Sequence, residues 1–360
     1  MKTAIFHNYM DNIGGAERVG LTLARELNAD IYSTVIDQKK IQQMGFDIKI
    51  KDIGWIPVNA PFRQQMALWR FRRLNLSKRY DYFIIDGDWA MSGAVNNKPN
   101  LWYVHSPIRE IWDLYEYTRK NNVAAWERPF FDIWVKYNRY LNKKYVSNVD
   151  KIICNSINTK NRIKKYLKRD ATVINPPTDT SKFGYKKTGN YWLSVNRLIS
   201  HKRVDMQIKA FAKMPDEKLI IVGCYEKSRH FISYAKYIQK IKPDNVTLIY
   251  WADFKEMIKL YAECKGFITT SKDEDFGMTP VEAMASGKPV IAPNEGGYKE
   301  TVIDGITGKL INNIDADKLV KAIKEIRKSL ESYKNACLKH AKKFDTSIFI
   351  RKIREQINER

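Results

Sequence analysis

The chain has 360 residues, of which 44% are hydrophobic, and its formal net charge is +23. This length suits two domains of ordinary size. It contains no apolar run near the roughly 20 residues of a transmembrane helix. The opening residues MKTAIFHNYM predict a first strand and lack the apolar segment of a signal peptide. The positive charge favours an anionic partner: nucleic acid, an anionic membrane surface or a phosphorylated substrate.

Apolar strands alternate with segments of helical period along the whole chain. The strands are expected at 4–7, 82–86, 101–105, 151–155, 172–174, 191–196, 218–223, 246–251, 266–271 and 290–292. The helices are expected at 16–27, 64–74, 130–145, 157–167, 204–213, 254–263 and 318–329. Strands rich in Ile and Val without strict alternation indicate parallel sheets covered on both faces. The sequence therefore predicts an α/β protein with two doubly wound, Rossmann-like domains.

The domain boundary is predicted at Asn175-Pro176-Pro177-Thr178-Asp179, where two prolines end a strand. We expect an N-terminal domain over 1–172, a linker over 173–188 and a C-terminal domain over 189–345. In doubly wound sheets, ligands bind outside the carboxyl ends of the strands. Four motifs occupy such positions: Gly14-Gly15, His105, Arg197 with Lys202, and Glu274.

The segment 273–293, DEDFGMTPVEAMASGKPVIAP, is the most informative. It predicts a turn at Phe276-Gly277, a helix that begins near Thr279-Pro280, and a buried strand. Free N–H groups at a helix start can hold an anion, and Glu274 with Glu282, expected on the first helical turn, can hold hydroxyl groups. Sugar nucleotides offer both phosphates and hydroxyls. The alternative is a surface acid beside an acid that the helix dipole stabilises by about 0.3–1 kcal/mol.

The other motifs each have a structural alternative. The guanidinium of Arg197 can bind two phosphate oxygens at once and Lys202 adds a point charge, so together they could neutralise a diphosphate. The alternative, which their position at a strand end disfavours, is that both are solvated surface cations. His105 could donate a hydrogen bond or carry a proton, or be structural. Gly14-Gly15 lets backbone N–H groups approach a phosphate, or forms a plain tight turn.

Charge and aromatic residues cluster in the first half of the chain. Residues 60–80 and 159–169 each hold six cations and no acid. The helix at 64–74 suits an anionic membrane interface, or packs on its own domain. The spacing of Phe130, Trp134, Tyr137 and Leu141 predicts a core stripe. The stretch 109–127 lacks clean periodicity and could be an acceptor-facing loop.

The four cysteines are scattered and form no C-x-x-C pair; they are Cys154, Cys224, Cys264 and Cys337. We expect buried free thiols in a reducing compartment. This favours a cytoplasmic protein, peripheral on the cytoplasmic membrane face if the basic N-terminal domain binds lipid. Five histidines offer few ligands for zinc, so no metal is expected.

Taken together, the residues match a known family. GGAE at 14–17, VHSP at 104–107, NRLISHK at 196–202 and EDFGMTPVEAMASGKPVIA at 274–292 resemble the family-4 retaining glycosyltransferases of GT-B fold. That fold has two Rossmann-like domains facing each other across a cleft. The segment HSPIREIWDLY at 105–115 is similar to the mannosyltransferase-like branch of polysaccharide and lipid-linked oligosaccharide assembly.

The resemblance implies a role for each motif. Arg197 and Lys202 would hold the donor diphosphate, and Glu282 the ribose hydroxyls. Glu274, with the N–H groups of Phe276, Gly277 and Met278, would hold the transferred sugar. Gly15 would lie by the phosphates, His105 by the sugar, and the base near Gly223 and Trp251-Ala252-Asp253. The N-terminal domain would bind the acceptor, and a last helix over 346–360 would cross back to it.

The implied reaction is metal-independent transfer of a hexose with retention at the anomeric carbon. GDP-mannose is the first candidate donor and UDP-sugars come next; the acceptor would be a glycan or a lipid-linked glycan. The family pattern commonly has Gly where Asp275 stands, which leaves the donor sugar open. Two alternatives remain: a GT-B epimerase, which needs no acceptor, and a basic nucleic-acid-binding protein, although no nucleic-acid motif is present.

Overall fold

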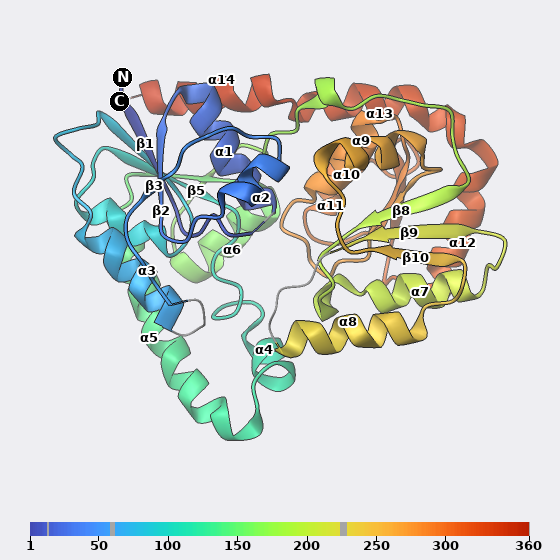
Figure 1. The fold of residues 1–360 in the computed structure, drawn as a ribbon, viewed down its shortest axis with the longest axis horizontal. Coiled ribbons are helices and arrows are strands. Elements are labelled where there is room, and N and C mark those ends of the chain that lie inside the picture. The colour runs from blue at the N-terminus through green and yellow to red at the C-terminus, as the bar shows by residue number, and fades with distance from the viewer. Residues whose placement is uncertain (13, 58–61, 224–228, 360) are drawn as a thin grey trace. The chain divides into compact units, whose positions relative to one another are not determined.

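The protein consists of two compact units, seen in a computed structural model that describes residues 1–12, 14–57, 62–223 and 229–359 (Figure 1). Unit 1 comprises Met1–Pro176 with Phe349–Arg360, and unit 2 comprises Pro177–Ile348. Each is built on one sheet whose strand pairs are all parallel. The prediction of two doubly wound, Rossmann-like α/β domains is confirmed.

The sheet of unit 1 has the strand order β3-β2-β1-β4-β5-β6-β7. Its strands are β1 (Thr3–His7), β2 (Asp30–Ser33), β3 (Lys51–Asp52), β4 (Tyr82–Asp86), β5 (Asn100–Val104), β6 (Lys151–Cys154) and β7 (Thr172–Val173). Its helices are α1 (Gly15–Leu27), α2 (Gln38–Gln43), α3 (Phe62–Arg73), α4 (Tyr115–Asn121), α5 (Arg128–Val146), α6 (Ile157–Leu167) and most of α14 (Thr346–Asn358). The short strands β2 and β3 had no counterpart in the prediction.

The sheet of unit 2 has the order β10-β9-β8-β11-β12-β13. Its strands are β8 (Tyr191–Val195), β9 (Lys218–Val222), β10 (Val246–Ile249), β11 (Phe267–Ile268), β12 (Val290–Pro293) and β13 (Gly308–Ile311). Its helices are α7 (Val204–Ala212), α8 (Arg229–Ile241), α9 (Phe254–Glu263), α10 (Met278–Ala285), α11 (Tyr298–Thr301), α12 (Ala316–Ile326) and α13 (Lys334–Ala341). β13, α8 and α13 were not predicted.

Both faces of the unit 2 sheet are buried, as the alternation along β8 illustrates. Trp192 packs into one core with residues of α7, α8 and α12. Its neighbour Leu193 packs into another core with residues of α9, α10 and α13. Successive side chains of a strand point to opposite faces, so every strand must be apolar on both sides. This explains why the sequence shows continuous apolar runs instead of alternation.

α14 completes unit 1 with four buried apolar side chains: Phe349, Ile350, Ile353 and Ile357. The ring of Phe349 packs edge-on against Tyr103 of β5, at a centroid distance of 5.6 Å. Lys151 Nζ donates to the carbonyl of Gln356 at 2.8 Å, and Arg354 donates to the carbonyl of Glu26 at 2.9 Å. The last helix is therefore an integral part of the unit that contains the N-terminus.

The aromatic stripe predicted on α5 is wrong in two of its four members. Leu141 is buried and Trp134 is partly buried, but Phe130 is 70% exposed and Tyr137 is 55% exposed. The buried face of α5 comprises Val135, Asn138, Leu141, Asn142, Tyr145 and Val146. Helical periodicity identified a continuous face, but a period does not say whether that face points to the core or to solvent.

Candidate active site

Four sequence motifs of unit 2 follow four adjacent strands. Trp251 follows β10, Gly223 follows β9, Lys202 follows β8 and Glu274 follows β11, and the sheet order is β10-β9-β8-β11. Because all these strands are parallel, their carboxyl ends share one edge of the sheet. The structure thus brings these four motifs to a single edge of the sheet.

Lys202 and Glu274 form an ion pair where the strand order changes direction. From β8 the chain proceeds outward to β9 and β10, then returns to β11 on the other side of β8. Lys202 Nζ lies 2.5 Å from Glu274 Oε2, and their side chains are 14% and 18% exposed. Such a switch point is where doubly wound sheets bind ligands. The pair places a cation and a carboxylate side by side in a largely desolvated position.

Arg203, which sequence reasoning missed, fixes the loop that carries Lys202. Its guanidinium donates to the carbonyl oxygens of Thr270 at 2.5 Å and Ser271 at 3.2 Å, and pairs with Glu295. The hydroxyl of Thr270 donates to the carbonyls of Lys202 and Arg203, at 2.9 and 3.0 Å. Lys202 is therefore held against the end of β11, whereas Arg197, earlier in the same loop, is exposed.

The loop from Glu274 to Met278 has the close backbone packing that only glycine permits. Gly277 has a φ of +93° and precedes the first residue of α10. A Cβ on Gly297 would lie 2.4 Å from Phe276 Cα, and Gly297 N donates to the Glu274 carbonyl at 2.8 Å. A Cβ on Gly296 would likewise clash with the Glu274 backbone, at 2.6 Å. The predicted Phe276-Gly277 turn is confirmed, and its partner Gly296-Gly297 was missed.

Tyr298 is a second residue that the sequence did not reveal. It is buried, its hydroxyl lies 2.6 Å from Thr269 Oγ1, and it donates to Glu274 Oε2 at 3.4 Å. Burial, reinforced by the negative charge of Glu274, raises the pKa of Tyr298 well above its ordinary value. Tyr298 therefore remains a neutral donor toward Glu274. Its signal in the sequence is the Gly-Gly-Tyr step after β12, a strand end like the others.

Glu282 is placed differently from the prediction. α10 begins at Met278 and has no acid in its first turn, so Glu282 lies on the second turn. Glu282 is 8% exposed, and its Oε2 accepts a 2.8 Å hydrogen bond from the hydroxyl of Tyr261. The alternative that Glu282 is a surface acid at the helix start is therefore excluded. A buried carboxylate costs free energy unless polar groups bind it, and Tyr261 is such a group. Asp275, between Glu274 and Phe276, is partly buried.

Some described helices begin with a side-chain cap and others without one; α1, α5, α7 and α10 are among those without. Ser156, Asp253 and Asp315 accept hydrogen bonds from the first turns of α6, α9 and α12. Among the residues that the structure describes, no side chain caps α10 after Gly277 or α1 after Gly14. The N–H groups at both starts can therefore serve an anionic or polar ligand. Gly14 and Gly15 lie as predicted, after β1 and at the start of α1.

Gly223 and Trp251 lie at the carboxyl ends of β9 and β10. A Cβ on Gly223 would lie 2.4 Å from the carbonyl oxygen of Asn196, so backbone strands approach closely there. Trp251 is 43% exposed, in the loop after β10, which ends at Ile249, two residues earlier than predicted. Asp253 has a structural function, since its carboxylate accepts from Glu256 N at 2.8 Å and caps α9.

In unit 1, His105 belongs to a buried cluster around Asp86. Asp86 Oδ1 lies 2.7 Å from His105 Nε2, and Asp86 Oδ2 lies 2.9 Å from His7 Nδ1. His7 ends β1 and Asp86 ends β4, and these adjacent strands form the switch point of the unit 1 sheet. Gly20 of α1 allows this, since a Cβ there would lie 2.4 Å from Asp86 Oδ2. His7 and Asp86 were missed, although each ends a predicted strand.

Several arginines of the two basic clusters, residues 60–80 and 159–169, form contacts within unit 1. Arg63 pairs with Asp11 at 2.7 Å and lies 4.0 Å above the ring of Tyr9. Arg162 is buried and donates to Ser106 Oγ at 3.1 Å. Arg169 donates to the carbonyls of Val146 and Val149. These arginines bind groups within unit 1. The number of cations that can bind an external anion is therefore smaller than the net charge suggests.

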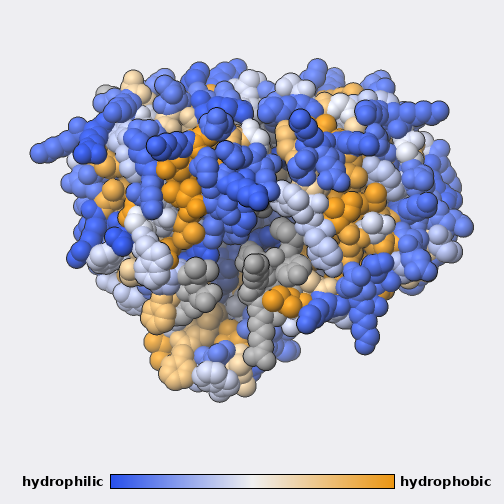
Figure 2. Space-filling model, in the orientation of Figure 1, coloured by the Kyte–Doolittle hydropathy of each residue, from blue (hydrophilic) through white to orange (hydrophobic). Residues whose placement is uncertain are grey.

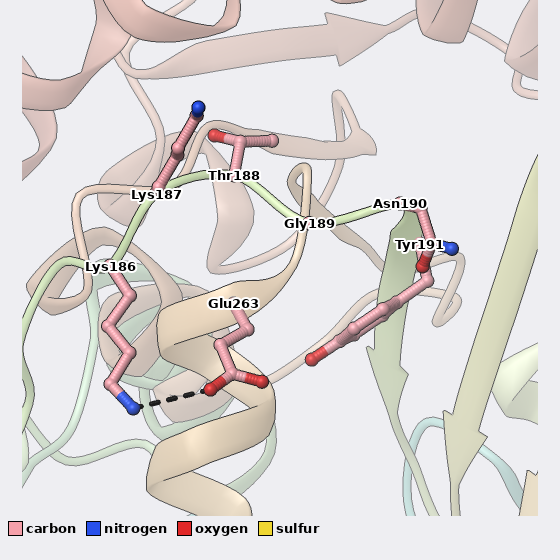
Figure 3. A pocket seen from close by; sticks show the side chains of 7 residues that line it. All are labelled: Lys186, Lys187, Thr188, Gly189, Asn190, Tyr191 and Glu263. Carbon is pink, nitrogen blue, oxygen red and sulfur yellow. Dashed lines mark hydrogen bonds and ion pairs between the residues drawn. The ribbon is translucent and has the colours of Figure 1, made fainter.

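A surface pocket of unit 2 lies at the other edge of the sheet (Figure 3). It is lined by Lys186, Lys187, Thr188, Gly189, Asn190, Tyr191 and Glu263. Tyr191 begins β8, whereas Lys202 follows the end of that strand. Lys186 and Glu263 pair at 3.3 Å in this pocket, which is therefore distinct from the predicted donor site.

Metal-binding and membrane-spanning features are absent from the part of the chain that the structure describes. Within that part, no group of three or more His, Cys, Asp or Glu residues could hold a metal ion. No helix there is both long and apolar enough to cross a bilayer. Cys154, Cys264 and Cys337 are buried free thiols, as predicted. Cys224 lies outside the described residues.

Comparison with protein families decides the identity of the chain. A model described as glycosyl transferases group 1 matches residues 177–344, and one described as glycosyltransferase family 4 matches residues 13–182. Together they span both units. The chain belongs to this glycosyltransferase family. The predictions of the family and of a glycosyltransferase are confirmed.

Two named relatives of this glycosyltransferase are mannosyltransferases. The alpha-1,3/1,6-mannosyltransferase ALG2 of Candida glabrata is 27% identical over 93% of this chain and 87% of its own length. The O-antigen chain mannosyltransferase RfbU of Salmonella typhimurium is 27% identical over 64% of this chain and 71% of its own.

Solved structures give the fold of the glycosyltransferase. Anabaena HepE, in complex with UDP and glucose, superimposes over the full length of both chains with a TM-score of 0.80 and 18% identity. WaaG, a glycosyltransferase of lipopolysaccharide biosynthesis, gives a TM-score of 0.71 at 14% identity, over 99% of this chain and 100% of its own. The GT-B fold is thereby confirmed.

Proposed function

We propose that this glycosyltransferase moves a hexose from a nucleotide sugar to a glycan or lipid-linked acceptor, with retention and without a metal ion. Mannose from GDP-mannose is the first candidate. The observation that carries the proposal is the Lys202–Glu274 pair, 2.5 Å apart at the switch point of unit 2. It joins a cation suited to a diphosphate and a carboxylate suited to sugar hydroxyls.

In the proposed reaction, bond cleavage at the anomeric carbon leaves negative charge on the nucleoside diphosphate. Arg197 and Lys202 neutralise this charge, and electrostatic stabilisation of this kind usually contributes most to catalysis. Glu274, oriented by Tyr298 and the packing of Gly297, accepts hydrogen bonds from sugar hydroxyls, with the N–H groups of Phe276, Gly277 and Met278 as donors. When donor phosphates arrive, Lys202 turns from Glu274 to them.

The remaining donor contacts follow the strand ends. Glu282, already bound by Tyr261, holds the ribose hydroxyls, and the base lies by Gly223 and Trp251. In unit 1, the Gly14-Gly15 start of α1 binds phosphate oxygens, and His105, oriented by Asp86, acts on the sugar. Unit 1 also binds the acceptor. Two mannosyltransferase relatives support mannose as the transferred sugar, and Asp275 is the residue we assign to selection between sugars.

The decisive experiment compares Lys202→Met with Lys209→Met. Lys209, on α7, forms an exposed ion pair with Asp205 and serves as the matched control. Purified variants are mixed with GDP-mannose, UDP-glucose or UDP-N-acetylglucosamine, and thermal unfolding is recorded. A donor at 100 times its Kd stabilises the protein by about 2.7 kcal/mol. We expect GDP-mannose to stabilise the wild type and Lys209→Met, with the effect lost in Lys202→Met.

Transfer assays then test the reaction itself. Lys202→Met should reduce kcat by about 10²–10³, the loss typical of a group that stabilises developing charge. Full activity of Lys202→Met would refute the site assignment, and stabilisation by UDP-sugars alone would refute the GDP-mannose assignment. Inhibition by EDTA would refute metal independence, an inverted anomer in the product would refute retention, and conversion without acceptor would indicate an epimerase.

A further inference from the structure

The ion pair of Lys202 and Glu274 is shielded from water, unlike pairs at the surface of unit 2. Lys202 Nζ and Glu274 Oε2 lie 2.5 Å apart, and their side chains are 14% and 18% exposed. Figure 2 shows hydrophilic residues, in blue, over much of the visible surface. A surface pair such as Lys213 with Asp317 has side chains 51% and 73% exposed and is screened by water. Lys202 and Glu274 lack that screening, so removing one of them leaves a poorly hydrated charge behind.

Glu274 is held in place by groups other than Lys202. The hydroxyl of Tyr298 donates to Glu274 Oε2 at 3.4 Å, and Gly297 N donates to the Glu274 carbonyl at 2.8 Å. A Cβ on Gly296 would lie 2.6 Å from that carbonyl oxygen, so this glycine packs directly on the Glu274 backbone. When Lys202 moves away, the carboxylate therefore stays where it is. It then needs other donors, or it remains largely desolvated without its cation.

Lys202, in contrast, combines a fixed backbone with a flexible side chain. The Thr270 hydroxyl donates to the carbonyls of Lys202 and Arg203, at 2.9 and 3.0 Å, and this anchors the loop on the end of β11. A lysine ammonium is a point charge on a flexible stem of four carbons. Lys202 can therefore exchange Glu274 for a phosphate oxygen by rotation about its side-chain bonds, while the loop stays in place.

Different ligands leave these two charges in different states. A nucleoside diphosphate alone attracts Lys202 by its phosphates but brings no transferable sugar, so Glu274 loses its cation beside a new anion. A free sugar offers hydroxyls but no phosphate for Lys202. A complete sugar nucleotide offers both, since hydroxyl groups donate to a carboxylate and phosphate oxygens accept from an ammonium. Only the complete donor replaces both partners of the ion pair.

We propose that the Lys202–Glu274 pair selects a complete sugar nucleotide against its nucleoside diphosphate and promotes release of the spent nucleotide. The inference rests on the donor site proposed above. Binding of phosphates at Lys202 and binding of sugar hydroxyls at Glu274 are coupled, because each ligand group lowers the cost of separating the pair. Once the hexose has left with the acceptor, Glu274 again lacks a hydroxyl donor. Lys202 then returns to Glu274, and the phosphates lose a cation.

The test is isothermal titration calorimetry of the full-length protein with GDP, GDP-mannose, UDP and UDP-glucose. Glu274→Gln removes the charge that holds Lys202. Glu274→Asp keeps a negative charge but withdraws the carboxylate from Lys202 by one methylene group. The matched control is Glu263→Gln, because Glu263 pairs with Lys186 at 3.3 Å at the other edge of the same sheet.

We expect Glu274→Gln to bind the nucleoside diphosphate about tenfold more tightly than the wild type, within the range of about 5- to 150-fold that is typical of coupled sites. Its preference for the sugar nucleotide over the diphosphate should fall toward one. Glu274→Asp should also bind the diphosphate more tightly, whereas simple repulsion between carboxylate and phosphates would leave its affinity at the wild-type value. Glu263→Gln should match the wild type with every ligand.

Thermal unfolding without ligand tests the ion pair itself. Lys202→Met should lower the midpoint more than Lys202→Met/Glu274→Gln does, because only the single variant leaves a carboxylate without its cation. A midpoint of the double variant equal to or below that of Lys202→Met would contradict the proposal.

Diphosphate binding by Glu274→Gln that is equal to or weaker than that of the wild type would overturn the proposal. So would wild-type diphosphate binding by Glu274→Asp. Both results leave the proposed function intact as long as the wild type binds GDP-mannose and Lys202→Met does not. If none of the four nucleotides bound to the wild type or to Glu274→Gln, the donor site itself would be refuted.

Discussion

Asp86 holds His105 in a fixed orientation, with 2.7 Å between Asp86 Oδ1 and His105 Nε2. Burial alone would raise the pKa of Asp86, but the charge and hydrogen bonds of His105 and His7 outweigh it and lower this pKa to about 2. Asp86 is therefore ionised at neutral pH. An ionised carboxylate only accepts hydrogen bonds, so His105 presents its Nε2–H and His7 its Nδ1–H to Asp86.

Asp86→Asn should lower the stability of the protein at pH 7 by about 2 kcal/mol, because a pKa difference of one unit corresponds to about 1.4 kcal/mol. A depressed pKa stabilises the folded state above the unfolded pKa, near 3.9, and this contribution is lost as pH falls toward 2. The urea midpoints of variant and wild type should thus converge between pH 4 and 2. The control is Asp81→Asn, an exposed position. Equal midpoints at pH 7 would contradict this prediction.

Gly297→Ala should disturb the Glu274 loop without backbone strain of its own. Gly297 has a φ of −67°, which alanine adopts readily, but the new Cβ would lie 2.4 Å from Phe276 Cα. We expect a loss of about 1–3 kcal/mol, as for other overpacked sites, and weaker donor binding by calorimetry. Gly184→Ala is the matched control, since a Cβ there would meet no described atom within 4 Å beyond its chain neighbours. Wild-type stability of Gly297→Ala would show that the loop packs more loosely.

Tyr261→Phe removes the hydroxyl that binds Glu282 and leaves the ring in place. A hydrogen bond to a charged group contributes about 1.5–3 kcal/mol, so the thermal midpoint should fall. The affinity for GDP should fall as well if Glu282 binds the ribose. Glu282→Gln tests the two effects separately, because the amide oxygen still accepts from Tyr261. Unchanged GDP binding by Glu282→Gln would remove Glu282 from the donor site.

Buried thiols should resist modification in the folded protein. Burial raises the pKa of Cys264 to about 12 and that of Cys337 to about 12. The thiolate is the reactive form, so at pH 8 neither should react with a disulfide reagent at an appreciable rate. A Cys224→Ser variant isolates the three buried thiols. We expect three thiols of this variant to react with the reagent in urea and none to react in its absence. Rapid reaction of the folded protein would contradict this prediction and indicate local opening.

The sequence predicted which residues of the candidate site lie at strand ends, because local patterns suffice for that. Lys202 and Glu274 each follow a predicted strand, and the rule for parallel sheets brings strand ends together. Their pairing at 2.5 Å was not foreseen, because strand order is set by long-range packing. Tyr261 and Tyr298 were missed for a related reason: each lies in an apolar segment, and only the fold turns its hydroxyl toward a carboxylate.

The error on α5 has a different origin. Phe130 and Tyr137 have the spacing of a core stripe, and core formation is the usual reason for such spacing. The buried face instead uses Asn138 and Asn142, whose side-chain oxygens accept hydrogen bonds from Gln65 of α3 and from Trp112, while Asn142 Nδ2 is buried without a partner among the described residues. A polar residue is buried at low cost only when its hydrogen bonds are satisfied, and those partners cannot be read from the helix alone.

The division of unit 1 between the two ends of the chain has a consequence for synthesis on the ribosome. Phe349, Ile350, Ile353 and Ile357 belong to the core of a unit whose first strand is made at the outset. Between Pro176 and Phe349 the ribosome must add all of unit 2, which takes on the order of 10 to 30 s at usual translation rates. During that interval the surface that receives α14 stays uncovered, so the nascent chain depends on unit 2 being finished before unit 1 can close.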